Sequence, residues 1–436
     1  MLLVIKIHNA IPSISLNKGL EIAQQGYITV SGYWRYWIDS QTRWPAALAT
    51  VVIYDQEAGG ILVPVDAVYT DADGHFISNP IPNIDGPGED GLDIVVRVLT
   101  ASPAAEVANP NIDWYYYTQT EVFPDRPDGP LYIGVRDTSW DDRGAWWIFS
   151  AHFGLTSGYL YLWSEVSYDT PTVTCFWPYG TWPQYVWPSQ EIHLPDWACW
   201  WDDIILHEYG HHVMYSLYGY IPPSMEEHSI NLRSNSTTAW AEGWANFFPL
   251  VVFDDPVFTW SNGTHYRDIN LETPHWCSEG WDDGDEVEGR VAGALWDTFD
   301  SDDDGYDVLD DGFHRIWNTT RDQNPDTFKE FWDAWNTTYY THPKGPSSPY
   351  DLQDWNHTLR AIFQNSIDYR GPGDVNVDGK VRVDDVLYAA LLVGTNKGDP
   401  EWDKLADVAP QPYGDDKIRI DDVYFVRSKF GNNYDC

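Results

Sequence analysis

The stretch DDIILHEYGHHVMYSLYG, residues 202–219, decides how the middle of this chain folds. It places His207 and His211 four residues apart, so on a helix both imidazoles project from one face, about one turn apart. Two imidazoles at that spacing can bind one tetrahedral zinc ion, and Glu208 is placed to take a proton from water. The stretch therefore predicts a zinc-binding helix with a general base, whereas His212 faces elsewhere and is expected to be structural.

A third protein ligand is expected from a second helix. The best candidate is Glu242 in AWAEGWANFF, a helix predicted to begin at Thr237 or Thr238 and to end at Pro249. No Ser or Thr stands three residues before this glutamate, so a capping-box role is disfavoured. Glu288 in EVEGRVAGALWD is the alternative third ligand, and the residues alone leave the choice open.

The motif HEYGHHVMY, followed some thirty residues later by AEGWANFF, resembles the gluzincin metallopeptidases, the thermolysin-like zincins. The resemblance implies a mainly helical α+β catalytic domain that hydrolyses peptide bonds. It further implies zinc bound by His207, His211 and Glu242, with Glu208 as the general base. Thermolysin-type sequences have an Asp four residues after the ligand glutamate. Here that position is Asn246, which can accept a hydrogen bond but carries no charge.

Such a reaction normally needs a further donor to the oxyanion that forms on the substrate. His275, Tyr266 and Arg290 are the candidates, and the sequence does not select among them. Upstream, EIHL from Glu191 resembles the edge strand that pairs with extended substrate in these enzymes.

The N-terminal part has a different pattern, with a period of two broken by turn residues from about Gly26 to Leu99. ATVVIYD, VDAVYTDADGHF and LDIVVRVL predict strands of an antiparallel β-sandwich. The region resembles transthyretin-like or carboxypeptidase-regulatory-like modules. Proline-rich FPDRPDGP, residues 123–130, predicts a linker. We therefore expect a multidomain chain with a β-sandwich over 1–125, a zincin-like α+β domain over 126–368 and a third module over 369–436.

Two acidic loops have the spacing of calcium sites, in which oxygen ligands recur at positions 1, 3, 5 and 12 around a glycine at 6. DSDDDGYDVLDD predicts calcium bound by Asp300, Asp302, Asp304 and Asp311, and a solvated acidic turn is the alternative. DVNVDGKVRVDD predicts a second site formed by Asp374, Asn376, Asp378, the Lys380 carbonyl and Asp385.

The last module contains an internal repeat, because KVRVDDVLYAALLVGTN from Lys380 is echoed by KIRIDDVYFVRSKFGNN from Lys417. The second copy has an insertion of about four residues, and its candidate calcium ligands are Asp407, Asp415 and Asp422. The pair resembles a type I dockerin, in the style of archaeal surface proteins. The resemblance implies a small all-α calcium loop–helix module and a cohesin-like protein partner.

Composition limits the possible partners. A formal net charge of −42 disfavours nucleic acid and anionic membranes, and 25 Trp with 28 Tyr argue for a folded chain. No apolar stretch approaches the ~18 residues of a membrane span. MLLVIKIHNA lacks the basic leader of a signal peptide. Sequons compatible with an exported glycoprotein stand at Asn235, Asn262, Asn318, Asn336 and Asn356.

The leading hypothesis is an extracellular or cell-surface zinc endopeptidase that also binds calcium and acts on peptide or protein substrates. The alternative is a non-enzymatic cell-surface or filament-forming protein that assembles through its sandwich and dockerin-like modules. A glycan-acting protein ranks last, because no pair of carboxylates indicates glycosidase chemistry.

Overall fold

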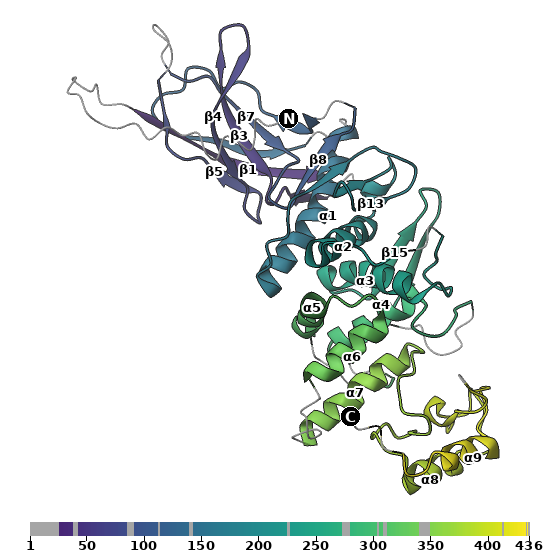
Figure 1. Cartoon of the computed structure of the whole chain (residues 1–436). Coiled ribbons are helices and arrows are strands. Elements are labelled where there is room, and N and C mark those ends of the chain that lie inside the picture. Colours follow the sequence, from purple (N-terminus) through teal and green to yellow (C-terminus); the bar gives the residue numbers. More distant parts are fainter. Residues whose placement is uncertain are drawn as a thin grey trace. The chain divides into compact units, whose positions relative to one another are not determined.

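In the computed structural model, the described residues are 26–37, 42–84, 91–111, 114–138, 143–224, 227–272, 280–302, 305–307, 312–339, 349–411, 414–432 and 434. The chain divides into two compact units, which alternate along the sequence (Figure 1). Unit 1 comprises Met1–Leu160 and Asp169–Ile205, and unit 2 comprises Tyr161–Tyr168 and Leu206–Cys436. The divisions fall within helices α1 (Arg143–Val166) and α2 (Asp202–Tyr218).

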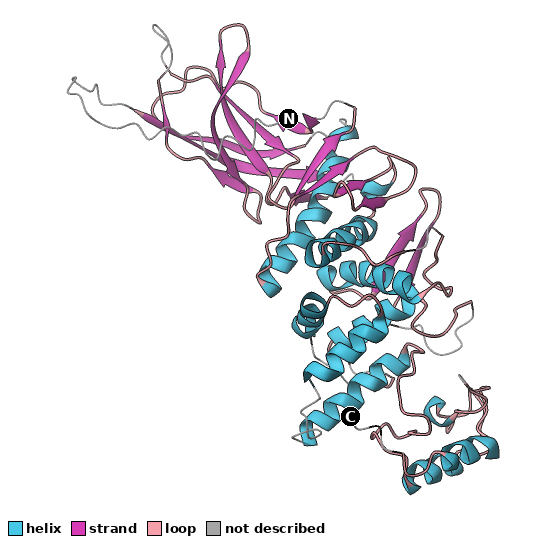
Figure 2. Ribbon diagram, in the orientation of Figure 1, coloured by secondary structure: helices cyan, strands magenta, loops and turns pink. Residues whose placement is uncertain are grey.

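Unit 1 is built mainly from strands (Figure 2). One sheet contains β11, β1, β2, β5 and β6, with bounds Gly129–Asp137, Tyr27–Trp37, Arg43–Pro45, His75–Ile77 and Ile81–Pro82. A second has the order β10-β7-β3-β4, with bounds Tyr117–Gln119, Ile94–Leu99, Thr50–Glu57 and Ile61–Tyr69. Their alternating inward side chains share one core, which includes Val30, Trp34, Ile53, Val96 and Leu131.

Two features of these sheets differ from the sequence predictions. β1 pairs with β11 in parallel, so the first sheet is mixed instead of antiparallel. β11 begins at Gly129 and extends this sheet past residue 125, where the composition placed the end of the sandwich. The proline-rich stretch before β11 therefore connects two strands of unit 1, because proline and glycine mark turns within a domain as well as linkers between domains.

A third sheet of unit 1 has the order β13-β14-β12-β8-β9, with bounds Gln184–Val186, Glu191–His193, Val173–Phe176, Ala105–Asn109 and Trp114–Tyr115. The predicted edge strand EIHL corresponds to β14. It pairs with β12 on one side and with β13 on the other, so the edge prediction is wrong. A three-residue strand has no sequence signal that separates an edge from an interior position, since both depend on long-range pairing.

Unit 2 is mainly helical. After α2 come α3, α4, α5, α6 and α7, with bounds Ser236–Phe253, Glu288–Phe299, Gly312–Gln323, Phe328–Tyr339 and Pro349–Gln364. A hairpin of β15 (Val257–Ser261) and β16 (Tyr266–Asn270) follows α3. Aromatic rings fill the interior, and Trp240 of α3 stacks on Phe331 of α6 with 5.2 Å between ring centroids.

The repeat forms the end of unit 2 as two short helices, α8 (Val383–Leu391) and α9 (Ile420–Ser428), each preceded by an acidic loop. Apolar residues from both copies share one small core, including Val381, Ala389, Ile418 and Val426. The chain is thus a multidomain α+β protein, as predicted at this level. The sandwich and dockerin assignments and the boundary predicted at residue 368 stay predictions. No helix in the described part of the chain is long and apolar enough to cross a membrane.

Candidate metal centre

Helix α2 carries both histidines of the motif, as the four-residue spacing predicts. It runs over Asp202–Tyr218 and ends at Gly219, which adopts a φ of +76° and donates its N–H to the Tyr215 carbonyl. The ring centroids of His207 and His211 lie 4.9 Å apart, so both imidazoles occupy one face, one turn from each other. His212 is fully buried on another face and contacts the Tyr209 ring.

Helix α3 carries Glu242, and both of its ends differ from the prediction. Asn235 caps it by accepting a hydrogen bond of 2.8 Å from the Thr238 N–H, so neither threonine begins the helix. Pro249 lies inside the helix, which continues to Phe253 and ends with Asp254 in the left-handed region. Proline removes one helical hydrogen bond, and the burial of nearly the whole helix offsets that loss.

The two helices approach closely because small residues line their contact. A Cβ on Gly210 of α2 would lie 3.1 Å from the Ala245 Cα of α3. At the same contact, Trp244 donates a 3.1 Å hydrogen bond from Nε1 to the Gly210 carbonyl. This close contact fixes the position of α3 along α2, and with it the turn of α2 that Glu242 faces.

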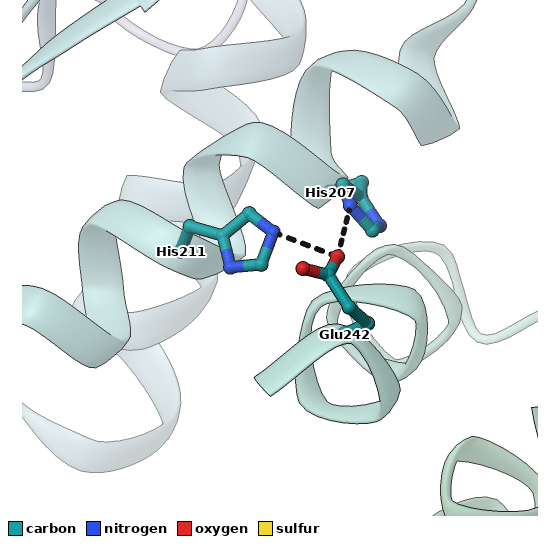
Figure 3. A group of neighbouring side chains, drawn as sticks. All are labelled: His207, His211 and Glu242. Carbon is teal, nitrogen blue, oxygen red and sulfur yellow. Dashed lines mark hydrogen bonds and ion pairs between the residues drawn. The ribbon is translucent and has the colours of Figure 1, made fainter. Parts of the chain in front are cut away.

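Three donor atoms converge between the helices, as Figure 3 shows. Glu242 Oε2 lies 3.3 Å from His207 Nε2 and 3.2 Å from His211 Nε2. The three donors lie within 4.8 Å of one another, and Glu242 is only 6% exposed. Burial raises the pKa of Glu242, but the neighbouring His211 and His207 outweigh it and hold the pKa well below its usual range. Two imidazoles and one ionised carboxylate fit the ligand set of a catalytic zinc site.

Neighbouring side chains orient these donors. Asn246 Oδ1 accepts a 2.9 Å hydrogen bond from His207 Nδ1, which leaves the Nε2 lone pair facing Glu242. Ser224 donates a 2.9 Å hydrogen bond to Glu242 Oε1, the oxygen that does not face His207 and His211. The side chain of Glu208 is buried on α2, between the two histidines in sequence.

Glu288, the alternative third ligand, begins α4 and has another partner. Its Oε2 lies 2.7 Å from His228 Nδ1, in the segment before α3. His228 Nε2 lies 3.8 Å from Glu242 Oε1, and the histidine is 29% exposed. The hydrogen bond to Glu288 and the charges of Glu242 and Glu208 raise the pKa of His228 to about 9, against the effect of burial.

None of the three predicted oxyanion donors has a described position that favours this role. Arg290 is fully buried, bonds the Asp282 carbonyl and pairs with Asp283 at 3.3 Å. Tyr266 is exposed on β16, and His275 lies outside the described residues. His228 is the polar residue near the site that the sequence did not indicate, because its partner Glu288 stands sixty residues further along.

Of the four predicted ligands of the first calcium loop, only Asp300 and Asp302 are described. Asp300 is buried directly after α4, and Asp302 is exposed. Asp304 and Asp311 lie outside the described residues, so this site stays a prediction.

The predicted loop of the first repeat is tightly organised. Asp374 accepts N–H bonds from Asp378 and Gly379, and Asp385 accepts them from Val375, Asn376 and Arg382. Burial, with the charges of Asp385 and Asp378, raises the pKa of Asp374 to about 7. Calcium binding by this loop stays a prediction.

Comparison with protein families indicates a broad class for this chain. Residues 162–347, less than half of the chain, match the family described as the Mycolysin C-terminal domain. The matched span contains both HEYGHH and AEGWA, and it supports a thermolysin-like metallopeptidase at the level of class.

No curated protein matches the chain. Among solved structures, a 9R-lipoxygenase from Cyanothece PCC8801 shares 10% identity at a TM-score of 0.20, covering 36% of this chain and 27% of that protein. An (S)-allantoin synthase shares 13% identity at a TM-score of 0.17, covering 26% of this chain and 41% of that protein. The chain thus spans less than half the length of either, and neither likeness bears on the fold or the function.

Proposed function

We propose that this protein is an exported zinc-dependent endopeptidase in which His207, His211 and Glu242 bind the metal. The observation that carries the proposal is the convergence of these three donors from two helices, with His211 and Glu242 buried. Glu242 Oε2 lies 3.3 Å from His207 Nε2 and 3.2 Å from His211 Nε2. The match of residues 162–347 to a mycolysin domain supports the same class of chemistry. Hydrolysis of extracellular proteins follows from that class and forms part of the proposal.

The residues of the site divide the work of peptide hydrolysis. When bound, zinc supplies a Lewis acid that makes water a stronger acid and polarises the substrate carbonyl. Glu208 accepts the proton of the attacking water and then passes it to the leaving amine. Asn246 keeps His207 in the tautomer that presents Nε2, and Ser224 holds the free oxygen of Glu242.

His228 is assigned as a positioning residue for the substrate. Glu288 fixes the ring through Nδ1, and the opposite edge of the ring faces Glu242 without a hydrogen bond, at 3.8 Å. We expect His228→Phe to lower kcat/KM at unchanged zinc content. Glu288→Gln is expected to weaken activity less, because a neutral amide can still accept the ring N–H. Loss of zinc from either variant would show a ligand-supporting role instead.

Casein hydrolysis by the zinc-loaded protein tests the proposed function. Cleavage is expected to stop on treatment with a zinc chelator and to be abolished in Glu208→Gln. The exposed Glu401→Gln is the matched control and should keep wild-type activity. Zinc-loaded wild-type protein that cleaves no protein substrate would refute the proposal.

Structural calcium is part of the proposed function. The loop with Asp300 and Asp302 and the first repeat loop with Asp374 and Asp385 would stiffen unit 2 by neutralising clustered carboxylates. The calcium content of the purified protein tests both sites. Removal of calcium by a chelator should also lower the melting temperature of the protein.

A second candidate function is a non-enzymatic surface protein that docks onto a cohesin-like domain. The observation that favours it is a set of exposed apolar side chains at two matching positions of α8 and α9, Val383 with Ile420 and Leu387 with Tyr424, to which α8 adds Leu391. Leu391 is 83% exposed. Binding of a purified cohesin domain that is lost in Leu387→Glu, with no proteolysis by the zinc-loaded protein, would favour this function over the first.

A further inference from the structure

The two repeat loops use their first aspartate in the same way. Asp374 Oδ1 and Oδ2 accept N–H bonds of 3.0 and 2.9 Å from Asp378 and Gly379. Asp407 accepts bonds of 3.0 and 2.9 Å from Asp415 and Asp416 at the corresponding oxygens. Asp415 therefore corresponds to Asp378, although four more residues separate it from the first aspartate of its own loop.

The last aspartate of each loop also repeats its bonds. Asp385 caps α8 by accepting the Arg382 N–H, and Asp422 caps α9 by accepting the Arg419 N–H. The other oxygen of Asp422 accepts the N–H groups of Val408 and Ala409, as Asp385 does with Val375 and Asn376. The correspondence of Asn376 with Ala409 follows, so the second loop lacks one side-chain oxygen of the first.

A buried lysine distinguishes the second loop. Three residues before Asp407 stands Lys404, whose Nζ lies 2.9 Å from Asp407 Oδ2, and the lysine is only 3% exposed. Three residues before Asp374 stands Gly371. A Cβ there would lie 1.8 Å from the Tyr434 ring, so the first loop has no room for a side chain at this position.

We propose that the Lys404 ammonium is the resident cation of the second loop, so that this loop binds no calcium while the first does. Two observations act together: the ammonium bonds the aspartate that would be the first ligand, and Ala409 removes an oxygen. A buried ammonium that bonds a carboxylate neutralises the charge of that carboxylate. Calcium would have to lose part of its hydration shell and compete with the ammonium for the same oxygen. The proposal replaces the expectation that Asp407, Asp415 and Asp422 hold calcium.

Calcium bound per full-length chain, measured by equilibrium dialysis with the metal alone, tests the proposal. Asp378→Ala and Asp415→Ala remove matched carboxylates from the two loops. Asp378→Ala should release one calcium ion, and Asp415→Ala should release none. Each aspartate is partly exposed and pairs with a half-exposed arginine, Arg382 or Arg419, so neither change leaves a buried charge unpaired. Release of one ion by Asp415→Ala would overturn the proposal, whatever the first loop does.

Restoring the missing ligand tests the lysine itself. Lys404→Ala combined with Ala409→Asn should gain one calcium ion per chain, whereas Ala409→Asn alone should gain none because the ammonium stays. The exposed Lys417→Ala is the control for a lost positive charge and should leave the calcium count unchanged. An equal gain in Ala409→Asn alone would contradict the role of Lys404. These outcomes do not depend on zinc or on peptidase activity, so the proposed enzyme function can fail without affecting them.

Discussion

Substitution of Asn246 tests how the protein tunes its proposed zinc ligands. Asn246 Oδ1 accepts the His207 Nδ1 proton over 2.9 Å, and the side chain is buried. Its other terminal atom, Nδ2, has no hydrogen-bond partner among the described residues. The asparagine therefore orients the histidine while leaving a buried donor unsatisfied, which is costly in a site of this kind.

Asn246→Ala removes the acceptor, and His207 is then free to turn its ring or change tautomer. Loss of such a supporting bond typically weakens metal binding by roughly 10–100-fold, equivalent to about 1.4–2.7 kcal/mol. Asn246→Asp keeps the acceptor, adds a charge and removes the unsatisfied donor, so zinc should bind more tightly than to the wild type. Its metal-free form should be less stable, because a buried carboxylate then lacks a cation.

Zinc affinity is measured by competition with a chelator of known affinity, alongside urea unfolding of each metal-free protein. The expected order of affinity is Asn246→Asp, then wild type, then Asn246→Ala. Equal affinity of Asn246→Ala and the wild type would refute the reasoning, because His207 would then need no support to bind the metal.

Three other perturbations test the packing and the charges around the site. Gly243→Val places a Cβ 2.6 Å from Val291, so α3 must move from α4, and urea unfolding should show a loss of about 1–3 kcal/mol. Asn235→Ala removes the cap of α3 and should cost about 1 kcal/mol in the same assay. Burial, with the nearby charge of Asp203, raises the pKa of Asp202 from 3.8 to about 7, so the folded state holds that proton more tightly than the unfolded state. The stability that this protonated carboxyl contributes is lost as pH rises from 4 through 7. Asp202→Asn should therefore make the melting temperature less dependent on pH over that range. Unchanged pH dependence in that variant would contradict the assignment.

The sequence predicted the parts of the site that depend on local geometry. Four-residue spacing on a helix is enough to bring His207 and His211 together, and helix start and stop signals indicated α2 and α3. It favoured Glu242 over Glu288 because of the residues around each, and the distances agree with that choice. Asn246 was predicted to accept a hydrogen bond, and it does so from His207.

Features that depend on contacts between distant segments were not predictable in this way. His228 becomes a candidate only through Glu288, which is brought beside it when α4 packs against α3. Pro249 indicated a helix end, but burial of α3 overrides the local preference. Lys404 looks like an ordinary surface lysine in the sequence, and only the turn that precedes Asp407 buries it.

The zinc content of three purified proteins tests the central claim most directly: wild type, Glu242→Gln and Glu288→Gln. The two variants remove one negative charge each from neighbouring buried glutamates, so general charge effects are matched. The arrangement of donors predicts one zinc ion per chain in the wild type and in Glu288→Gln, and little or none in Glu242→Gln. Full zinc retention by Glu242→Gln, or a wild type that binds no zinc, would contradict the account.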